Sequence, residues 1–199
     1  DDGDDGLFAV AADDVNDAVA SVSTSGIRRH TLSLDATPAV VIGIGTSHRR
    51  RLEHELRILW CSTMAGLAAG ALELGAAHCR EREQFGAKIG TFQAVAHRLA
   101  DAWLDTRLIE ATARQAAWRT DHDLPAAQAA ASAALWACEG GQRVVMAAQH
   151  VHGGVGVDLD YPVHRFYRQA KEVELDIGGA GAAARRLGDE IADHALTIG

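Results

Sequence analysis

Two segments of the chain contain side chains whose types and spacing could bind a ligand. The first, residues 80–93, begins with charged residues around Arg82. A guanidinium presents a rigid fork of N–H donors that suits a phosphate or a carboxylate. The second, residues 152–156, contains Gly153-Gly154, and glycine lets a backbone approach a ligand because no Cβ intervenes. Either feature alone is weak evidence, because a helix-end arginine is usually a solvated charge and a glycine pair is usually a turn.

Helices must position both segments, because a helical period surrounds each of them. From about Ser47, apolar and small residues recur at steps of three and four, which predicts one long helix that ends near Glu81. Gly66 and Gly70 lie inside this helix and would each cost it about 1 kcal/mol against alanine. The two glycines therefore indicate that another helix packs closely against this one.

The remaining sequence predicts further helices with short connections. A linker at 84–90 leads to a second helix that ends near Asp121, and a third helix opens at Pro125, where a missing N–H is harmless. After the glycine loop, two more helices lie on either side of a break at 178–181, and the last one ends near Ala195. Long helices with short loops predict an up-down helical bundle.

Residues 7–45 differ from everything after them. Short apolar runs at 7–11 and 39–44 alternate with Gly, Pro, Ser and Asp, which is typical of strands joined by turns. Strands from so short a segment cannot close a sheet around a core, so we expect residues 1–46 to be the remnant of a larger β-domain. Residues 47–199 are then the helical bundle domain. The predicted fold class is mainly α, with a partial β-domain before a C-terminal bundle.

In their order and context, the two segments resemble the C-terminal part of acyl-CoA dehydrogenases. The first match reads REREQFGAKIGTFQ over residues 80–93. The second reads HGGVG over 152–156, DYPV over 160–163 and RFYRQAK over 165–171. Both motifs together, in this order and between helices, are specific, and the resemblance extends roughly from residue 52 to the end.

The resemblance implies an FAD site at a contact between two subunits, where one subunit holds the pyrophosphate and adenosine of its neighbour's FAD. Arg82 would bind a phosphate oxygen through its guanidinium fork. Gln84 matches a position where the family often has a hydrogen-bonding residue, and Phe85 would pack beside the cofactor. Gln93 matches a glutamine that reaches the adenine part of FAD.

In the second motif, the resemblance implies that Gly153 and Gly154 let the backbone approach the FAD. The family's usual glutamine before this pair falls on His150, by gapless spacing from Gly156, and Gln149 lies one residue early. Histidine also donates a hydrogen bond. His150 is therefore the expected cofactor contact at this position, with an imidazole in place of the family's glutamine amide.

The resemblance also implies that a carboxylate removes the proton α to a thioester while the flavin N5 accepts the β-hydride. The family's usual glutamate falls on Ile177, and its alternative place on the first long helix falls on Leu56, next to Arg57. Asp176 and Glu55 each lie one residue away, but one step along a helix turns a side chain by about 100°. The base is therefore unassigned, with Asp176 as the substitute to consider, and Arg57 is expected near the substrate thioester.

Composition and charge exclude several classes of protein. The 199 residues have a formal charge of -8, which argues against a nucleic-acid partner because phosphate binding needs clustered Lys and Arg. Three scattered cysteines indicate reduced thiols in a cytosolic protein. No apolar run is long and unbroken enough to predict a membrane span. Because the chain opens on Asp1 without a methionine, we expect that part of the protein lies upstream.

A metal-binding bundle is a different reading of the same helices. Ferritin-like proteins use Glu-x-x-His pairs on facing helices, but His78 and Glu81 occur here in the reverse order. The cysteines are too far apart for a zinc ligand set. We therefore expect no metal site.

The resemblance favours a subunit of a tetrameric, flavin-dependent acyl-CoA dehydrogenase that passes electrons to an electron-transferring flavoprotein. The alternative is a non-catalytic partner that completes the FAD site of another polypeptide. Some actinobacterial enzymes of this family, which act on CoA thioesters of steroid side chains, are hetero-oligomers that divide the flavin contacts and the base between two subunits. A chain without either glutamate would fit such a partner.

Overall fold

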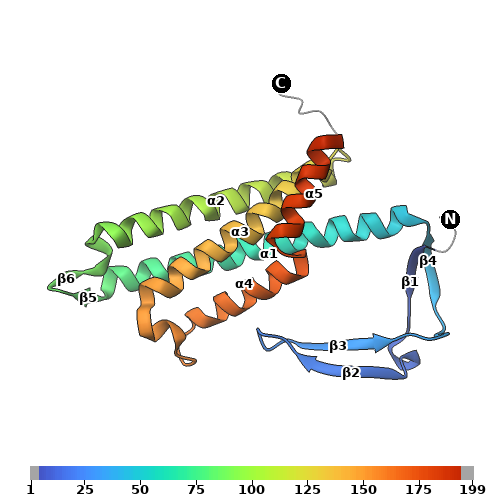
Figure 1. Ribbon diagram of the computed structural model, residues 1–199, viewed down its shortest axis with the longest axis horizontal. Coiled ribbons are helices and arrows are strands. Elements are labelled where there is room, and N and C mark those ends of the chain that lie inside the picture. The colour runs from blue at the N-terminus through green and yellow to red at the C-terminus, as the bar shows by residue number, and fades with distance from the viewer. Residues whose placement is uncertain (1–4, 194–199) are drawn as a thin grey trace. The chain divides into compact units, whose positions relative to one another are not determined.

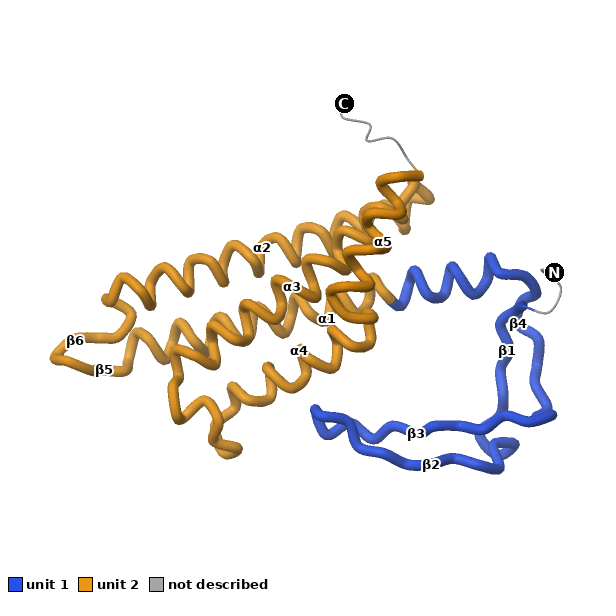
Figure 2. Tube along the Cα trace, viewed as in Figure 1, with its two compact units in different colours: residues 1–56 blue, residues 57–199 orange. Residues whose placement is uncertain are grey.

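The computed structural model describes residues 5–193 and confirms a mainly α protein (Figure 1). The chain forms two compact units that join between Leu56 and Arg57 (Figure 2). The change from strand to helix comes earlier in the sequence, because α1 (Thr46–Glu81) begins ten residues before the end of the first unit. The predicted end of the last helix near Ala195 lies outside the described residues.

In the first unit, four strands form two antiparallel pairs. β1 (Gly6–Ala9) pairs with β4 (Val40–Ile44), and β2 (Asp17–Val22) pairs with β3 (Arg28–Ser33), while the one-turn helix η1 (Ala12–Asp14) joins β1 to β2. Most of the strand side chains are exposed, including large apolar ones such as Val40. A two-stranded pair is marginally stable on its own. That these strands belong to a larger β-domain stays a prediction.

The second unit is an up-down helical bundle, as the sequence predicted (Figure 1). After α1, its helices are α2 (Gln93–Asp121), α3 (Ala127–His152), α4 (Val163–Ile177) and α5 (Ala180–Asp193). The central helix is α3, which packs against α2, α4 and α5. The short helices η2 (Ile89–Thr91) and η3 (Gly153–Val157) join the long ones.

The predicted start of the third helix at Pro125 was wrong by two residues. The Pro125 carbonyl accepts a hydrogen bond from Arg119 Nε at 2.6 Å, so this residue closes the turn after α2. The first backbone hydrogen bond of the next helix runs from Ala130 N to the Ala126 carbonyl at 2.8 Å. Pro125 is therefore the end of a turn rather than the first helical residue.

Small residues allow α1 and α3 to approach each other closely. A Cβ on Gly141 of α3 would lie 2.5 Å from Met64 Sδ of α1, and one on Gly75 of α1 would lie 3.4 Å from Ala148 Cα. Met64 is fully buried between the two helices. The thiols of Cys61 and Cys138 are also buried, and burial raises the pKa of each to about 12. The centre of the bundle is thus tightly packed and apolar.

The two glycines inside α1 have different environments. A Cβ on Gly70 would lie 2.6 Å from Cε1 of Phe166 on α4, so this glycine makes room for an aromatic ring. A Cβ on Gly66 would meet nothing within 4 Å, and Gly66 is exposed. The prediction of a close helix neighbour is therefore confirmed at Gly70 and wrong at Gly66.

By length and composition alone, α1 is apolar enough to cross a membrane, and it is the one helix within residues 5–193 that meets this test. The test is weak evidence, because the core helix of a folded bundle also passes it. The buried side of α1 is occupied by α3 and α4, through the contacts of Met64, Gly70 and Gly75. These contacts account for the apolar content of α1 as bundle packing.

The two glycines provide a matched pair of stability tests. We expect Gly66→Ala to raise the free energy of unfolding by about 0.5–1 kcal/mol, because alanine favours the helix and meets no neighbour there. We expect Gly70→Ala to lower it by about 1–3 kcal/mol, because Phe166 must move. Urea unfolding of the two variants measures both changes, and equal effects at the two positions would contradict this packing.

Candidate functional site

The segment after α1, predicted as a linker, is a small β-hairpin. β5 (Glu83–Gln84) pairs with β6 (Ala87–Lys88), and an ion pair of 2.7 Å joins Glu83 Oε1 to Lys88 Nζ. The two turn residues, Phe85 and Gly86, have φ angles of 54° and 77°. Positive φ at both central residues is the conformation of a tight type I′ hairpin turn.

Phe85 is an unusual residue for the tip of this hairpin. Left-handed backbone is costly for a bulky side chain, and the ring is 95% exposed. Its nearest aromatic neighbour is Phe92, with 6.3 Å between the ring centroids. Because the fold gains little from a strained and exposed phenylalanine, this position points to contact with a ligand or a partner.

The second motif begins where α3 ends. Gly153 has φ 60° and ψ −136°, a combination open essentially to glycine alone. This residue turns the chain out of α3 and into η3. Gly156 is buried against Gln149, since a Cβ there would lie 2.9 Å from both the side-chain Nε2 and the carbonyl of Gln149. The side chain of Gln149 therefore packs against the loop at Gly156.

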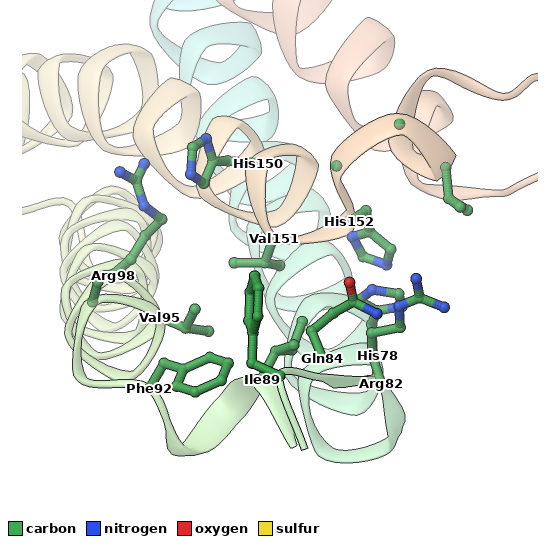
Figure 3. Close-up of a pocket in the computed structure, with 15 residues that line it drawn as sticks. His78, Arg82, Gln84, Ile89, Phe92, Val95, Arg98, His150, Val151 and His152 are labelled. Carbon is green, nitrogen blue, oxygen red and sulfur yellow. The ribbon is translucent and has the colours of Figure 1, made fainter. Parts of the chain in front are cut away.

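The hairpin and the glycine loop line the same cavity, which has a volume of about 700 Å³ (Figure 3). Its apolar wall includes Ile89, Val95 and Val151. Within the described chain, its lining contains two arginines and three histidines but no aspartate or glutamate. The two arginines give this lining a positive charge in a chain whose net charge is -8, which suits a negatively charged ligand. The charged and titratable lining residues are His78, Arg82, Arg98, His150 and His152.

The two arginines lie on opposite sides of the pocket (Figure 3). Arg82, beside His78 and Gln84, makes no side-chain ion pair or hydrogen bond with any residue in 5–193. Arg98, from α2, lies on the same side as His150. An arginine without a partner among the described residues can offer its guanidinium fork to an incoming phosphate.

A buried histidine holds the base of the glycine loop. His152 is only 5% exposed, and its Nδ1 lies 2.7 Å from the Ala148 carbonyl. A carbonyl only accepts hydrogen bonds, so Nδ1 donates this one, and in the neutral ring Nε2 accepts from the Tyr161 hydroxyl at 3.2 Å. These two bonds fix the ring in the tautomer protonated on Nδ1 and tie α3 to the segment before α4.

His78 stacks on this fixed ring, with 4.3 Å between the centroids and 28° between the planes. Its pKa is lowered, first because partial burial disfavours the charged imidazolium and then because His152 and Arg82 lie nearby. Glu81 acts in the opposite direction. The environment therefore favours the neutral form of His78 in the protein alone.

The structure brings most of the predicted cofactor residues together. The six that line the cavity are Arg82, Gln84, Phe85, His150, Gly153 and Gly154. Gln93, the first residue of α2, is exposed and does not line the cavity. His150 rather than Gln149 faces this space, which agrees with the gapless spacing from Gly156.

The predicted substrate and base residues lie away from the cavity. Arg57 is half-buried and precedes His78 by 21 residues on the same helix, which is about 30 Å along its axis. Asp176 is half-buried in the last turn of α4 and does not line the cavity. At the two positions where the family has a glutamate, Leu56 is exposed and Ile177 is buried.

Among the charged or titratable lining residues, sequence reasoning missed three, His78, His152 and Arg98. One signal was available for His78, because it precedes Arg82 by four residues and such a spacing puts two side chains on one face of a helix. His152 directly precedes the glycine pair, but its bond to Tyr161 depends on how the chain folds back after η3. Arg98 gave no local signal.

The fold and the pocket define a helical-bundle domain with a basic cavity between a hairpin and a glycine loop at one end. Residues 44–195 match the family model described as "Acyl-CoA dehydrogenase, C-terminal domain". The chain therefore belongs to the acyl-CoA dehydrogenase family.

Relatives of known sequence and structure agree with this assignment. Acyl-CoA dehydrogenase FadE27 of Mycobacterium tuberculosis is 38% identical over 94% of this chain and 53% of its own. A chain of the ChsE4-ChsE5 complex from the same species is 38% identical, with a TM-score of 0.89. The match covers 95% of this chain and 52% of that one. A chain of a variant of the Tcur3481-Tcur3483 steroid ACAD is 39% identical, also with a TM-score of 0.89; the match covers 94% of this chain and 52% of that one. The chain thus spans about half the length of these relatives.

Substitution of the two neighbouring glycines tests which of them needs a backbone conformation that only glycine adopts easily. We expect Gly153→Ala to lower the free energy of unfolding by about 1–3 kcal/mol, because alanine is strained at this φ and ψ. Gly154→Ala should leave stability nearly unchanged, since its Cβ would meet nothing within 4 Å. Thermal unfolding tests both. A large loss of stability in Gly154→Ala would show that the loop is packed differently.

Proposed function

We propose that this chain is part of a subunit of an FAD-dependent acyl-CoA dehydrogenase, and that its basic pocket holds the pyrophosphate and adenosine of FAD. The observation that supports this is the convergence of Arg82, the hairpin and the glycine loop on one cavity that no carboxylate within residues 5–193 lines. A pyrophosphate is doubly negative and an adenosine is flat and partly apolar. Two arginines beside apolar walls suit both parts of such a ligand.

Within this proposal, each of the six predicted cofactor residues that line the cavity has a role that its chemistry permits. Arg82 binds a phosphate oxygen, and Gln84 and His150 donate hydrogen bonds. Phe85 packs on the cofactor, and the backbone at Gly153 and Gly154 approaches it without a Cβ in between. FAD, when bound, supplies the acceptor for the β-hydride in the α,β-desaturation of an acyl-CoA thioester, before the electrons pass to an electron-transferring flavoprotein. Gln93 would contact the adenine only through the assembled oligomer.

The proposed substrate is an acyl-CoA thioester, with Arg57 on the substrate side. Arg57 lies about 30 Å along α1 from the pocket, so one chain can contribute to the cofactor site and to a substrate site at separate places. Because the Tcur3481-Tcur3483 protein is a steroid ACAD, a CoA thioester with a steroid side chain is the first substrate to test.

The second candidate is a non-catalytic partner that completes the FAD site of another polypeptide in a heterotetramer. Two observations favour it: a leucine and an isoleucine occupy the positions of the family's catalytic glutamates, and two relatives are each named as a pair of polypeptides. In the first candidate, Asp176 or a residue from an N-terminal part of the protein outside these 199 residues acts as the base. Asp176 already interacts with another group of the protein. It lies in the last turn of α4 and does not line the pocket.

Expression of the full-length protein alone and with its neighbouring dehydrogenase gene separates the two candidates. A yellow, active oligomer formed by this protein alone would support a catalytic subunit. Protein that is insoluble or colourless alone, but yellow and active with the second polypeptide, would support the partner function. Asp176→Asn adds a check, because a general base at this position predicts at least a hundredfold loss of kcat at unchanged flavin content.

We expect Arg82→Ala to weaken FAD binding by about tenfold to a hundredfold, because it removes a charge-assisted hydrogen bond to phosphate. The matched control is Arg80→Ala, which removes an exposed arginine from the same helix end without altering the lining of the pocket. The ratio of flavin absorbance to protein absorbance after dialysis measures retention. Equal flavin content in wild type and Arg82→Ala would refute the proposed site.

A further inference from the structure

We propose that His78 is a second ligand for the phosphate bound at Arg82, and that it takes up a proton when this anion binds. The inference deepens the proposed function, because FAD is the occupant that the pocket would hold. It concerns the phosphate end of the ligand alone, so smaller phosphates can test it separately. Nothing in the sequence resemblance assigns a role to this residue.

Position and spacing bring His78 to the same part of the pocket as Arg82. The two residues are four apart in the last turns of α1, so their side chains leave the same face of the helix. Both line the cavity, and Figure 3 shows their side chains next to each other and beside Gln84. An anion that reaches the Arg82 guanidinium therefore comes within reach of the His78 ring.

The His78 ring is held in place but its nitrogens are available. It stacks at 4.3 Å on His152, which is itself fixed by hydrogen bonds to Ala148 and Tyr161. Within residues 5–193, neither ring nitrogen of His78 makes a hydrogen bond. A rigid ring with free polar atoms at a pocket wall is preorganised to bind a ligand, because little rotamer entropy is lost on binding.

The charges around His78 determine how it responds to an anion. Burial of the ring is the main cause that lowers its pKa; from α1, Arg82 lowers it further, whereas Glu81 raises it. From α3, His152 lowers the pKa, and His150 also lines the pocket. Within residues 5–193, the other charged group that lines this space is Arg98 of α2, and the Tyr161 hydroxyl before α4 bonds to His152 behind it.

A phosphate at Arg82 reverses this balance. Its negative charge offsets the positive charge of Arg82 and stabilises the imidazolium, so the pKa of His78 is higher in the complex than in the protein alone. Between these two pKa values, binding takes up a proton. Affinity therefore rises as the pH falls through the pKa of the complex, and it levels off below the pKa of the free protein. Each unit by which the pKa of His78 differs between the complex and the free protein corresponds to a tenfold change in affinity.

Titration calorimetry of the full-length, flavin-depleted oligomer tests this inference, with ADP, inorganic pyrophosphate and FAD as separate probes. Measurement in buffers of different ionisation enthalpy gives the number of protons taken up on binding. For wild type we expect net uptake and an affinity that rises about tenfold as the pH decreases from 8 to 6. For His78→Phe, which keeps an aromatic ring to stack on His152, we expect the uptake and the pH dependence to disappear.

Two further variants separate this role from a purely structural one. His78→Gln keeps a hydrogen-bond donor without a titratable ring, so it should bind at pH 8 nearly as wild type does but without the rise at pH 6. His122→Gln removes an exposed histidine at the opposite end of α2 and should behave like wild type. If His78→Phe retains the uptake of wild type, the proton goes elsewhere, for example to His150, and the inference is wrong.

The three probes distinguish failure of this inference from failure of the proposed function. FAD binding without uptake at His78 would leave the proposed function intact and refute the role of His78. Uptake at His78 with ADP or pyrophosphate, but no binding of FAD, would support the role of His78 and refute the FAD site. Absence of binding by all three probes would refute both.

Discussion

The close approach of α1 and α3 is the contact on which the pocket depends. Gly141 faces the buried Met64 side chain, and Gly75 lies against Ala148, so the two helix backbones come near each other where larger residues would hold them apart. The hairpin follows the end of α1, and the glycine loop follows the end of α3. Because both helices are long and stiff, their packing brings together two segments that are about seventy residues apart in the chain.

The pocket has a charge opposite to that of the protein. An acidic chain would repel a free phosphate over most of its surface, but two arginines and three histidines line this cavity, and no carboxylate does so among the described residues. The nearest acidic residue of the hairpin, Glu83, is paired with Lys88 at 2.7 Å. The ion pair lowers the pKa of Glu83 and stabilises the hairpin turn while it neutralises a charge close to the pocket.

Two side chains, His152 and Gln149, hold the glycine loop in position. His152 uses both ring nitrogens, one on Ala148 and one on Tyr161, and thereby joins α3 to the chain that enters α4. Gln149 fills the space under Gly156, and its side-chain oxygen has no hydrogen-bond partner within the described chain. The bonded His152 ring and the turn at Gly153 position the loop, and a site that binds through its backbone requires such support.

The sequence by itself determined the helical bundle, the two motifs and the absence of a glutamate at Leu56 and Ile177, because periodicity, glycine and residue identity are local properties. It did not determine that residues 83–88 form a hairpin with Phe85 in a left-handed conformation, nor which of Gly66 and Gly70 faces a neighbour. Only the tertiary structure decided that His78, Arg98 and His152 share one cavity with the motifs. The physical reason is that burial, stacking and pocket charge depend on which helix faces meet, and that is set by packing between residues far apart in the chain.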